Sequence, residues 1–154
     1  MTLLDSLPPS LLAINPHLAR RKPRGTPRWK RPVEVSGRLD GGTVSLVFKG
    51  LVLVSEANTR EHWTVKAARA KWQRATVTEA LGTLPVPRLP VRVTIVRVGP
   101  RALDLDNSWG SAKFVTDAIA AWCEVDDGDV ARFRCSVSQE RGGYGVRVVI
   151  EGAA

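Results

Sequence analysis

The sequence predicts a single α+β domain over residues 41–154, in which two main helices pack on one mixed β-sheet. Short segments in which every second residue is apolar, typical of half-buried strands, predict the sheet. They are interleaved with two longer segments in which apolar residues recur every three or four positions, which is typical of helices. A chain of 154 residues with 44% hydrophobic residues is also long enough to bury one substantial core.

Residues 1–40 differ in composition and predict a separate, proline-rich basic arm. No acidic residue interrupts the basic run between positions 20 and 31. Prolines deny helix and sheet hydrogen bonds and like charges repel, so we expect a flexible or extended arm. Trp29 places an aromatic ring among cations, which favours nucleic-acid contact through Arg28, Lys30 and Arg31. A solubilising tail is the alternative.

The first half of the domain predicts two strands and a long helix. Residues 43–54 contain two apolar runs separated by Gly50, which predicts a turn or bulge between two strands. Asn58 followed by Glu61 predicts a helix N-cap with a capping box, and the helix extends to about residue 81. The expected buried stripe of this helix comprises Trp63, Ala67, Ala70, Val77 and Leu81.

Basic residues on neighbouring faces of this helix have two interpretations. They are Arg60, Lys66, Arg69 and Lys71. Such a face is commonly just solvated, but the formal net charge of +8 makes phosphate contact an equal alternative.

The second half predicts a strand, a helix and a hairpin. Residues 91–98 alternate strictly and predict a strand, with Arg92, Thr94 and Arg97 turned away from the core or at the edge. A second helix is expected over residues 108–122. Residues 130–137 and 144–150 predict two further strands joined by a turn at residues 141–143.

Composition excludes several classes of protein. No apolar run approaches the ~18 residues of a membrane span, and the first residues lack the charge order of a secretory signal, so we expect a cytoplasmic protein. Cys123 and Cys135 are too few for a zinc knuckle, and two reduced thiols are expected. The sequence pI of about 10.3 points to an acidic partner, with nucleic acid first.

Two acidic clusters suggest a metal site. On extended chain Asp104 and Asp106 would point the same way while Leu105 enters the core, and such paired carboxylates suit Mg²⁺ or Mn²⁺. Two solvated acids in a turn would explain the pair about as well. A second cluster follows at residues 124–129, and an EF-hand is excluded because position 12 of neither loop is Glu. Lys113 would act at a scissile phosphate or form an i,i+4 ion pair with Asp117.

Three motifs in this order resemble the catalytic core of the RusA-type Holliday junction resolvases, a largely phage-derived family of endodeoxyribonucleases. They are Arg101-Ala102-Leu103-Asp104-Leu105-Asp106-Asn107, Lys113-Phe114-Val115-Thr116-Asp117-Ala118-Ile119 and Val125-Asp126-Asp127-Gly128-Asp129-Val130. The segment 55–63 with the basic residues after it is similar to the strand-to-helix entry of phage members. The resemblance covers roughly residues 43–151.

The resemblance implies an intertwined homodimer that nicks branched DNA in two like strands. It implies that Asp104, Asp106 and Asp127 bind Mg²⁺, with Asp126 beside the third aspartate, and that Lys113 acts in catalysis. Arg101, inside the first motif, is expected to contact DNA. No small-molecule cofactor is implied. About three extra residues separate Asn107 from Lys113 relative to the family spacing, and a turn at residues 108–110 would keep the lysine facing the metal.

The expected function is therefore Mg²⁺-dependent, structure-selective cleavage of four-way junctions and other branched DNA. The alternatives are a non-catalytic nucleic-acid-binding recombination accessory, which would leave the acidic cluster unexplained, and a partner-binding scaffold with a degenerate nuclease fold.

Overall fold

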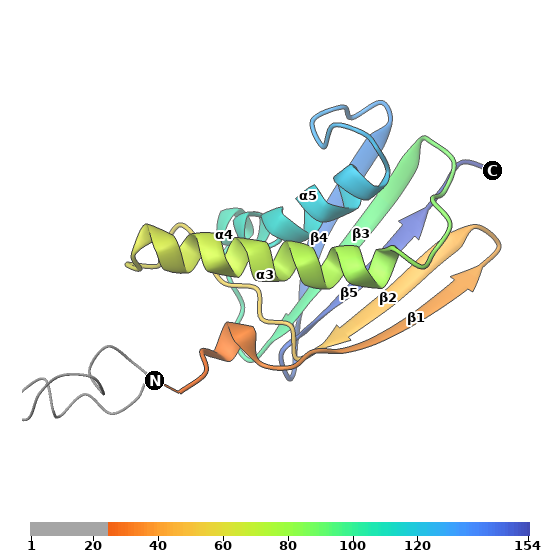
Figure 1. Cartoon of the computed structure of the whole chain (residues 1–154). Helices are drawn as coiled ribbons and strands as arrows, with labels where there is room; N and C mark the ends of the chain where they lie inside the picture. The colour runs from red at the N-terminus through yellow and green to blue at the C-terminus, as the bar shows by residue number, and fades with distance from the viewer. Residues whose placement is uncertain (1–24) are drawn as a thin grey trace, which may run out of the picture.

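Residues 25–154 of the chain are described by a computed structural model, and the arm before Gly25 lies outside the described residues (Figure 1). The chain forms, in order, η1 (Arg28–Lys30), β1 (Glu34–Asp40), β2 (Thr43–Lys49), α3 (Trp63–Leu81), β3 (Val91–Gly99), α4 (Leu105–Ser111), α5 (Lys113–Trp122), β4 (Phe133–Arg141) and β5 (Gly145–Glu151). These elements make the α+β architecture with a mixed sheet that the sequence predicts.

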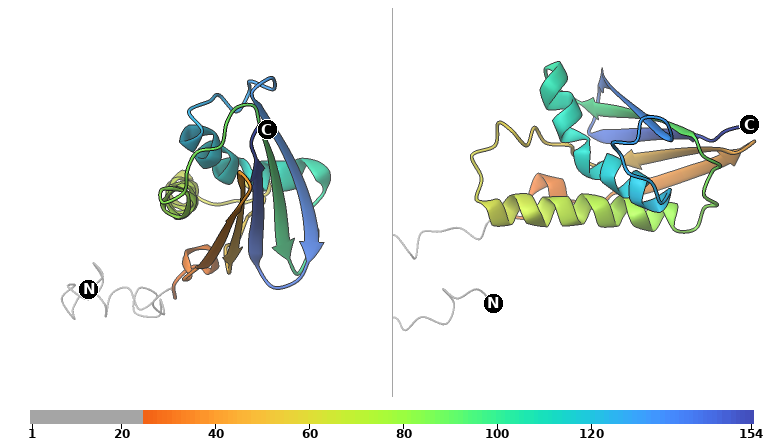
Figure 2. Two further views of the ribbon diagram at one scale, coloured as in Figure 1. Left: turned by 90° about the vertical axis from the view of Figure 1, so that its right-hand side faces the viewer. Right: turned by 90° about the horizontal axis from the view of Figure 1, so that it is seen from above.

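The five strands form one sheet in the order β1-β2-β5-β3-β4. Only β3 and β4 are parallel, and the other neighbours are antiparallel. Helices α3 and α5 lie side by side on one face of this sheet (Figure 2). The architecture is therefore two-layered, with the core between the helices and that face.

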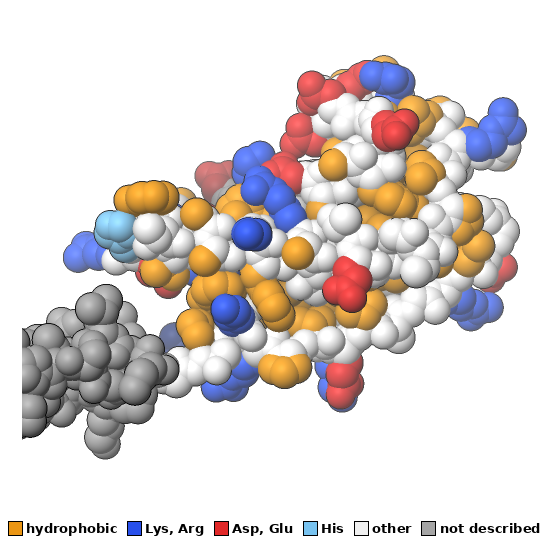
Figure 3. Space-filling model, viewed as in Figure 1, with side chains coloured by type: hydrophobic (Ala, Val, Ile, Leu, Met, Phe, Trp, Pro, Cys, Tyr) orange, Lys and Arg blue, Asp and Glu red, His pale blue; other side chains and the backbone are white. Residues whose placement is uncertain are grey.

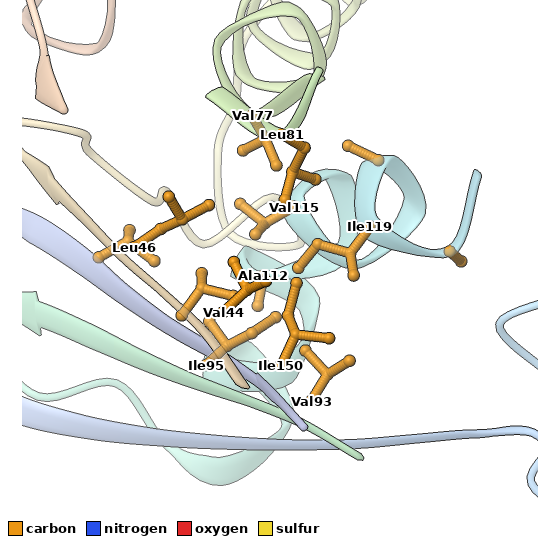
Figure 4. Packing of buried hydrophobic residues seen from close by; sticks show 14 of the residues in the cluster. Val44, Leu46, Val77, Leu81, Val93, Ile95, Ala112, Val115, Ile119 and Ile150 are labelled. Carbon is orange, nitrogen blue, oxygen red and sulfur yellow. The ribbon is translucent and has the colours of Figure 1, made fainter. Parts of the chain in front are cut away.

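The core is built from the alternating residues of the central strands. Val44, Leu46, Val93, Ile95 and Ile150 meet a stripe of helical residues, including Val77, Leu81, Val115 and Ile119 (Figure 4). Each of these side chains is at most 2% exposed. The apolar residues that alternate along the strands thus pack against those spaced three and four apart along the helices, and together they form one apolar layer, as predicted.

The strand predicted from residue 43 is confirmed as β2, but a further strand that was not predicted precedes it. β1 occupies Glu34–Asp40, inside the predicted arm, and pairs with β2 along its whole length. Gly41 and Gly42 form the two-residue connection with φ of 55° and 85°, the conformation that a tight hairpin requires and that glycine adopts without strain. The folded domain therefore begins before residue 41.

Residues 51–54, predicted as a strand, are a buried loop instead. This segment passes beside α3, where the side chain of Gln73 donates a hydrogen bond to the carbonyl of Val52 over 3.0 Å. A short apolar run can be buried in a loop as well as in a strand. Its composition alone therefore does not predict the secondary structure correctly.

The first helix begins later than predicted. α3 starts at Trp63 and is capped by His62, whose Nδ1 accepts a hydrogen bond from the amide of Thr64, so Asn58 is not the N-cap. Trp63 is 72% exposed and Ala67 is also exposed, whereas Arg69 and Gln73 join Ala70, Val77 and Leu81 in the buried stripe. Glu61, predicted to close a capping box, contacts Arg69 instead.

Three further predictions need correction. β4 and β5 are not a hairpin, because β3 lies between them and pairs with both. Arg97 shares the helix-facing parity of Val93 and Ile95 and is only 6% exposed, with its guanidinium donating to the carbonyls of Leu53 and Arg101. The predicted second helix is divided at Ala112 into α4 and α5.

Candidate active site and nucleic-acid interface

The first acidic motif forms the N-terminus of α4. Asp104 caps this helix: its Oδ1 accepts from the amide of Asn107 over 2.9 Å and its Oδ2 from the Asn107 side chain over 2.7 Å. Asp104 and Asp106 are both exposed. Because the chain becomes helical at Leu105, the predicted alternation fails, and Leu105 is 71% exposed instead of entering the core.

Side chains from two distant segments hold this motif in place. Gln139 of β4 accepts from the amide of Leu103 over 2.9 Å and donates to the Leu103 carbonyl. Ser55 donates to Oδ1 of Asn107 over 2.7 Å. The carboxylate of Asp104 is therefore the end of a hydrogen-bonded chain that runs from Ser55 through Asn107.

A buried ion pair anchors the loop that carries Ser55. The guanidinium of Arg69 donates to both carboxylate oxygens of Glu56, over 2.7 and 2.8 Å, and approaches a carboxylate oxygen of Glu61 at 2.8 Å. The Arg69 side chain is fully buried. These hydrogen bonds, chiefly those with Glu56, raise the pKa of Arg69 above its ordinary value.

Lys113 is the first residue of α5. Its Nζ lies 3.2 Å from Oδ1 of Asp117, so the i,i+4 ion pair that the spacing suggests is present. Asp117 also accepts from Arg74 of α3 over 2.8 Å. Because the lysine side chain is 61% exposed, it remains accessible to an anion from solvent.

The second acidic cluster lies in the loop between α5 and β4, and Figure 3 shows its acidic side chains gathered at the top of the molecule. Asp126 accepts from the amide of Gly128 over 2.8 Å and shapes the turn. Asp129 pairs with Arg132 at 2.7 Å, and this hydrogen bond lowers the pKa of Asp129. Asp127, between them, is exposed.

Two of the predicted catalytic residues meet in one cavity. Lys113 and Asp127 both line a pocket of about 760 Å³ between α4, α5 and β4. Asp104 and Asp106 do not line it. Over residues 25–154, no three acidic, histidine or cysteine side chains gather closely enough to hold a metal ion, so the predicted aspartate trio does not form a centre in this conformation.

A basic cleft lies at the other end of the acidic motif. It consists of two adjoining cavities of about 490 and 530 Å³ that share Arg28, Val52 and Tyr144. Four basic residues in its lining are not buried: Arg28, Arg31, Lys49 and Arg101. Arg69 and Arg97 also line it but are buried, and Arg69 pairs with Glu61, the one acid of the lining. Leu103 also lines the cleft, so it reaches the residue directly before Asp104.

Aromatic side chains organise this basic cleft. Arg28 donates to the hydroxyl of Tyr144 over 2.9 Å, and its guanidinium lies 5.3 Å from the centre of the Tyr144 ring. Trp29 lines the cleft beside it. Interleaved cations and rings can contact both the phosphates and the bases of a nucleic acid.

The predicted nucleic-acid-binding residues do not share one surface. Arg28, Arg31 and Arg101 line the basic cleft, and Lys30 is exposed on the same short helix as Arg28. Arg60 and Lys71 are exposed, while Lys66 donates to the Glu56 carbonyl over 3.0 Å. The prediction for Arg69 is wrong. Its charge is buried and neutralised by Glu56 and Glu61, so it is not on the exposed basic face.

Sequence reasoning missed three residues of these cavities. Trp109 and Val130 line the pocket of Lys113, and Tyr144 holds Arg28. A tryptophan two positions after the Asp-Asn motif was the signal available for the first. The contact between Tyr144 and Arg28 spans 116 positions, which no local pattern indicates.

The two cysteines are free, as expected, and burial raises the pKa of Cys123 to about 11. Within residues 25–154 no helix combines the length and apolarity needed to cross a membrane.

No protein-family model matches the chain, and no curated protein is significantly similar to it. The resemblance to the RusA-type resolvases therefore depends on the motif residues alone.

Proposed function

We propose that the protein is a Mg²⁺-dependent, structure-selective endonuclease of branched DNA, acting as a homodimer. The observation that carries this proposal is the single cavity that both Lys113 and Asp127 line. These two residues are 14 positions apart, and the resemblance assigns both to catalysis. A second support is the basic cleft, which leads to Asp104 and suits the phosphates of a DNA arm.

In this proposal Lys113 contacts the phosphate to be cleaved and stabilises the negative charge that develops on it. Asp117 holds the lysine at the cavity through the 3.2 Å ion pair. The cleft residues Arg28 and Arg101 hold the neighbouring phosphates and so position the strand.

Asp104, Asp106 and Asp127 have the oxygen ligands that Mg²⁺ prefers. They are not gathered in this conformation, so the proposal requires them to converge when metal and DNA bind. Isothermal titration of Mg²⁺ into the protein, with and without junction DNA, tests that requirement. Binding that needs none of the three aspartates would refute the assignment.

The test of the function is cleavage of a labelled immobile four-way junction and of its linear duplex, with Mg²⁺ or EDTA. Asp104→Asn is the informative variant, because Asn caps a helix about as well as Asp and keeps one oxygen to accept from the amide of Asn107. We expect paired nicks in the junction only, lost in EDTA and reduced at least 100-fold by Asp104→Asn and by Lys113→Ala.

Arg38→Ala is the matched control for Lys113→Ala, since it removes an exposed cation of β1 that lies outside both the Lys113 cavity and the basic cleft. Single-turnover cleavage at saturating protein should be unchanged within about twofold. Equal losses of cleavage in Lys113→Ala and Arg38→Ala would show that Lys113 contributes only to the overall positive charge of the protein. Sedimentation of the free protein at the mass of one chain would refute the homodimer.

A second candidate function is DNA binding without cleavage, as a recombination accessory. The basic cleft favours it, because its cations and aromatic rings can bind nucleic acid without any of the three aspartates. Junction binding with no nicks in Mg²⁺ or Mn²⁺, and with affinity unchanged by EDTA, would establish this function in place of the first.

A further inference from the structure

The cavity that holds Lys113 and Asp127 has a part that phosphate chemistry does not use. Beside those two residues, its lining is Trp109, Gly110, Thr116, Val130, Phe133, Arg134 and Cys135. Phe133 is almost fully buried and belongs to the core, whereas Trp109 is 43% exposed and Val130 71% exposed. Two large apolar side chains thus face solvent directly beside a lysine.

This exposed apolar surface has no partner within residues 25–154. Burying it would be favourable, and exposed apolar surface next to polar groups is typical of a binding site. At about 760 Å³ the cavity is within the size range of small-molecule sites. An aromatic ring flanked by an aliphatic side chain provides a surface on which a flat ring can stack.

The lining of the cavity carries two cations, Lys113 of α5 and Arg134 of β4, against one acid, Asp127. The Nε of Arg134 donates to the Val130 carbonyl over 3.3 Å, while its two terminal nitrogens make no hydrogen bond within residues 25–154. A flat apolar ring attached to an anion would therefore complement the cavity: the ring would fill the apolar part and the anion would meet the cations.

We infer that this cavity receives one nucleobase, extruded from the stack beside the phosphate that Lys113 contacts. Trp109 stacks on the base, and the terminal nitrogens of Arg134 hydrogen-bond to its edge, so these two residues set the cleavage-site preference. This inference rests on the proposed nuclease function. A second copy of the chain is the alternative occupant, and the sedimentation measurement below distinguishes it from a base.

The experiment is a double-mutant cycle that compares cleavage rates after removal of Trp109, of the base, and of both. Junctions with a single abasic nucleotide, moved one position at a time past the nick site, are cleaved by wild-type protein and by Trp109→Ala. Because base–aromatic stacking contributes about 5- to 150-fold in equilibrium, we expect one abasic position to reduce cleavage by that factor. Trp109→Ala should cause the same loss on the intact junction and no further loss on that abasic junction.

Trp63→Ala is the matched control, since Trp63 is an exposed tryptophan at the start of α3 and does not line the cavity. It should show no coupling to any abasic position. Trp109→Phe should retain most of the activity, and Arg134→Gln should relax the base preference at the coupled position only.

Independent effects of Trp109→Ala and the abasic site at every position would overturn the inference. So would a drop in sedimentation mass of Trp109→Ala, because the cavity would then be occupied by a second copy. If wild-type protein cuts no junction, the proposed nuclease function fails by itself. The same cycle is then measured on junction affinities in EDTA, where coupling supports the base site and its absence refutes it.

Discussion

Removing the carboxylate of Glu56 should destabilise the domain more than any other loss of a single surface charge. Arg69 is 0% exposed, and Glu56 supplies two of its contacts while being only 18% exposed itself. Glu56→Ala therefore leaves a buried guanidinium with one remaining partner, Glu61 at 2.8 Å. Breaking a buried pair in this way costs roughly 3–5 kcal/mol, and the partial exposure of Glu56 places the loss near 3 kcal/mol.

The corresponding change at Glu61 supplies the comparison. Glu61 is 36% exposed, and its removal leaves the two hydrogen bonds between Arg69 and Glu56 intact. A pair of this exposure contributes at most about 1 kcal/mol. Glu61→Ala should therefore cost about one third as much as Glu56→Ala.

Urea unfolding, followed by far-UV circular dichroism, gives the free energy of unfolding of both variants. An unchanged dependence of that free energy on urea concentration would show that the unfolded state is unaffected. A loss of 3 kcal/mol should lower the melting temperature by about 10 °C for a domain of this size. Combining Arg69→Met with Glu56→Leu should recover about 2 kcal/mol relative to the sum of the single changes, since no unpaired buried charge remains. Equal losses at Glu56 and Glu61, or strict additivity in the double variant, would refute the reasoning.

Three further predictions concern single groups. Because burial raises the pKa of Cys123 to about 11, its alkylation in the native protein at pH 8 should be far slower than in urea; equal rates would contradict its burial. The hydrogen bond from Arg132 lowers the pKa of Asp129, so this contact stabilises the fold above the ordinary pKa of 3.8 and is lost as pH falls. The carboxyl NMR titration midpoint of Asp129 should accordingly rise towards 3.8 in Arg132→Ala, and no change would contradict the contact. Gly42, at φ of 85°, should lose about 1–2 kcal/mol on substitution by alanine in a urea melt, whereas a neutral result would show that the hairpin tolerates the change.

The sequence predicted those features that local periodicity controls. The two-residue alternation located β3, β4 and β5 to within a few residues, and helical spacing located the C-terminal ends of α3 and α5. β1 was missed because its residues are all exposed and follow a proline-rich basic run. The pair Gly41-Gly42 after Asp40 is a hairpin signal that would have found it.

The candidate site was predictable in part for the same reason. The spacing from Lys113 to Asp127 spans one helix and one loop, and both residues do line one cavity. The orientation of Asp104 and Asp106 was not predictable from strand alternation, because the helix begins at Leu105. The burial of Arg69 depends on carboxylates from the preceding loop, and helix periodicity alone does not show such a partner.

The position of β5 in the sheet has a consequence for how the protein is made. β5 is the last strand in the chain but lies between β2 and β3, so it bonds to a neighbour on each side. Until it leaves the ribosome, the β1–β2 hairpin and the β3–β4 pair have no strand in common. The acidic motif, held by Gln139 of β4, and the basic cleft, closed by Tyr144 before β5, therefore come together only after nearly all of the domain has been synthesised. A nascent chain stopped before residue 145 would carry the charges of the proposed DNA site without the fold that positions them. Ribosome-stalled chains of increasing length would reveal this as an abrupt gain of protease resistance.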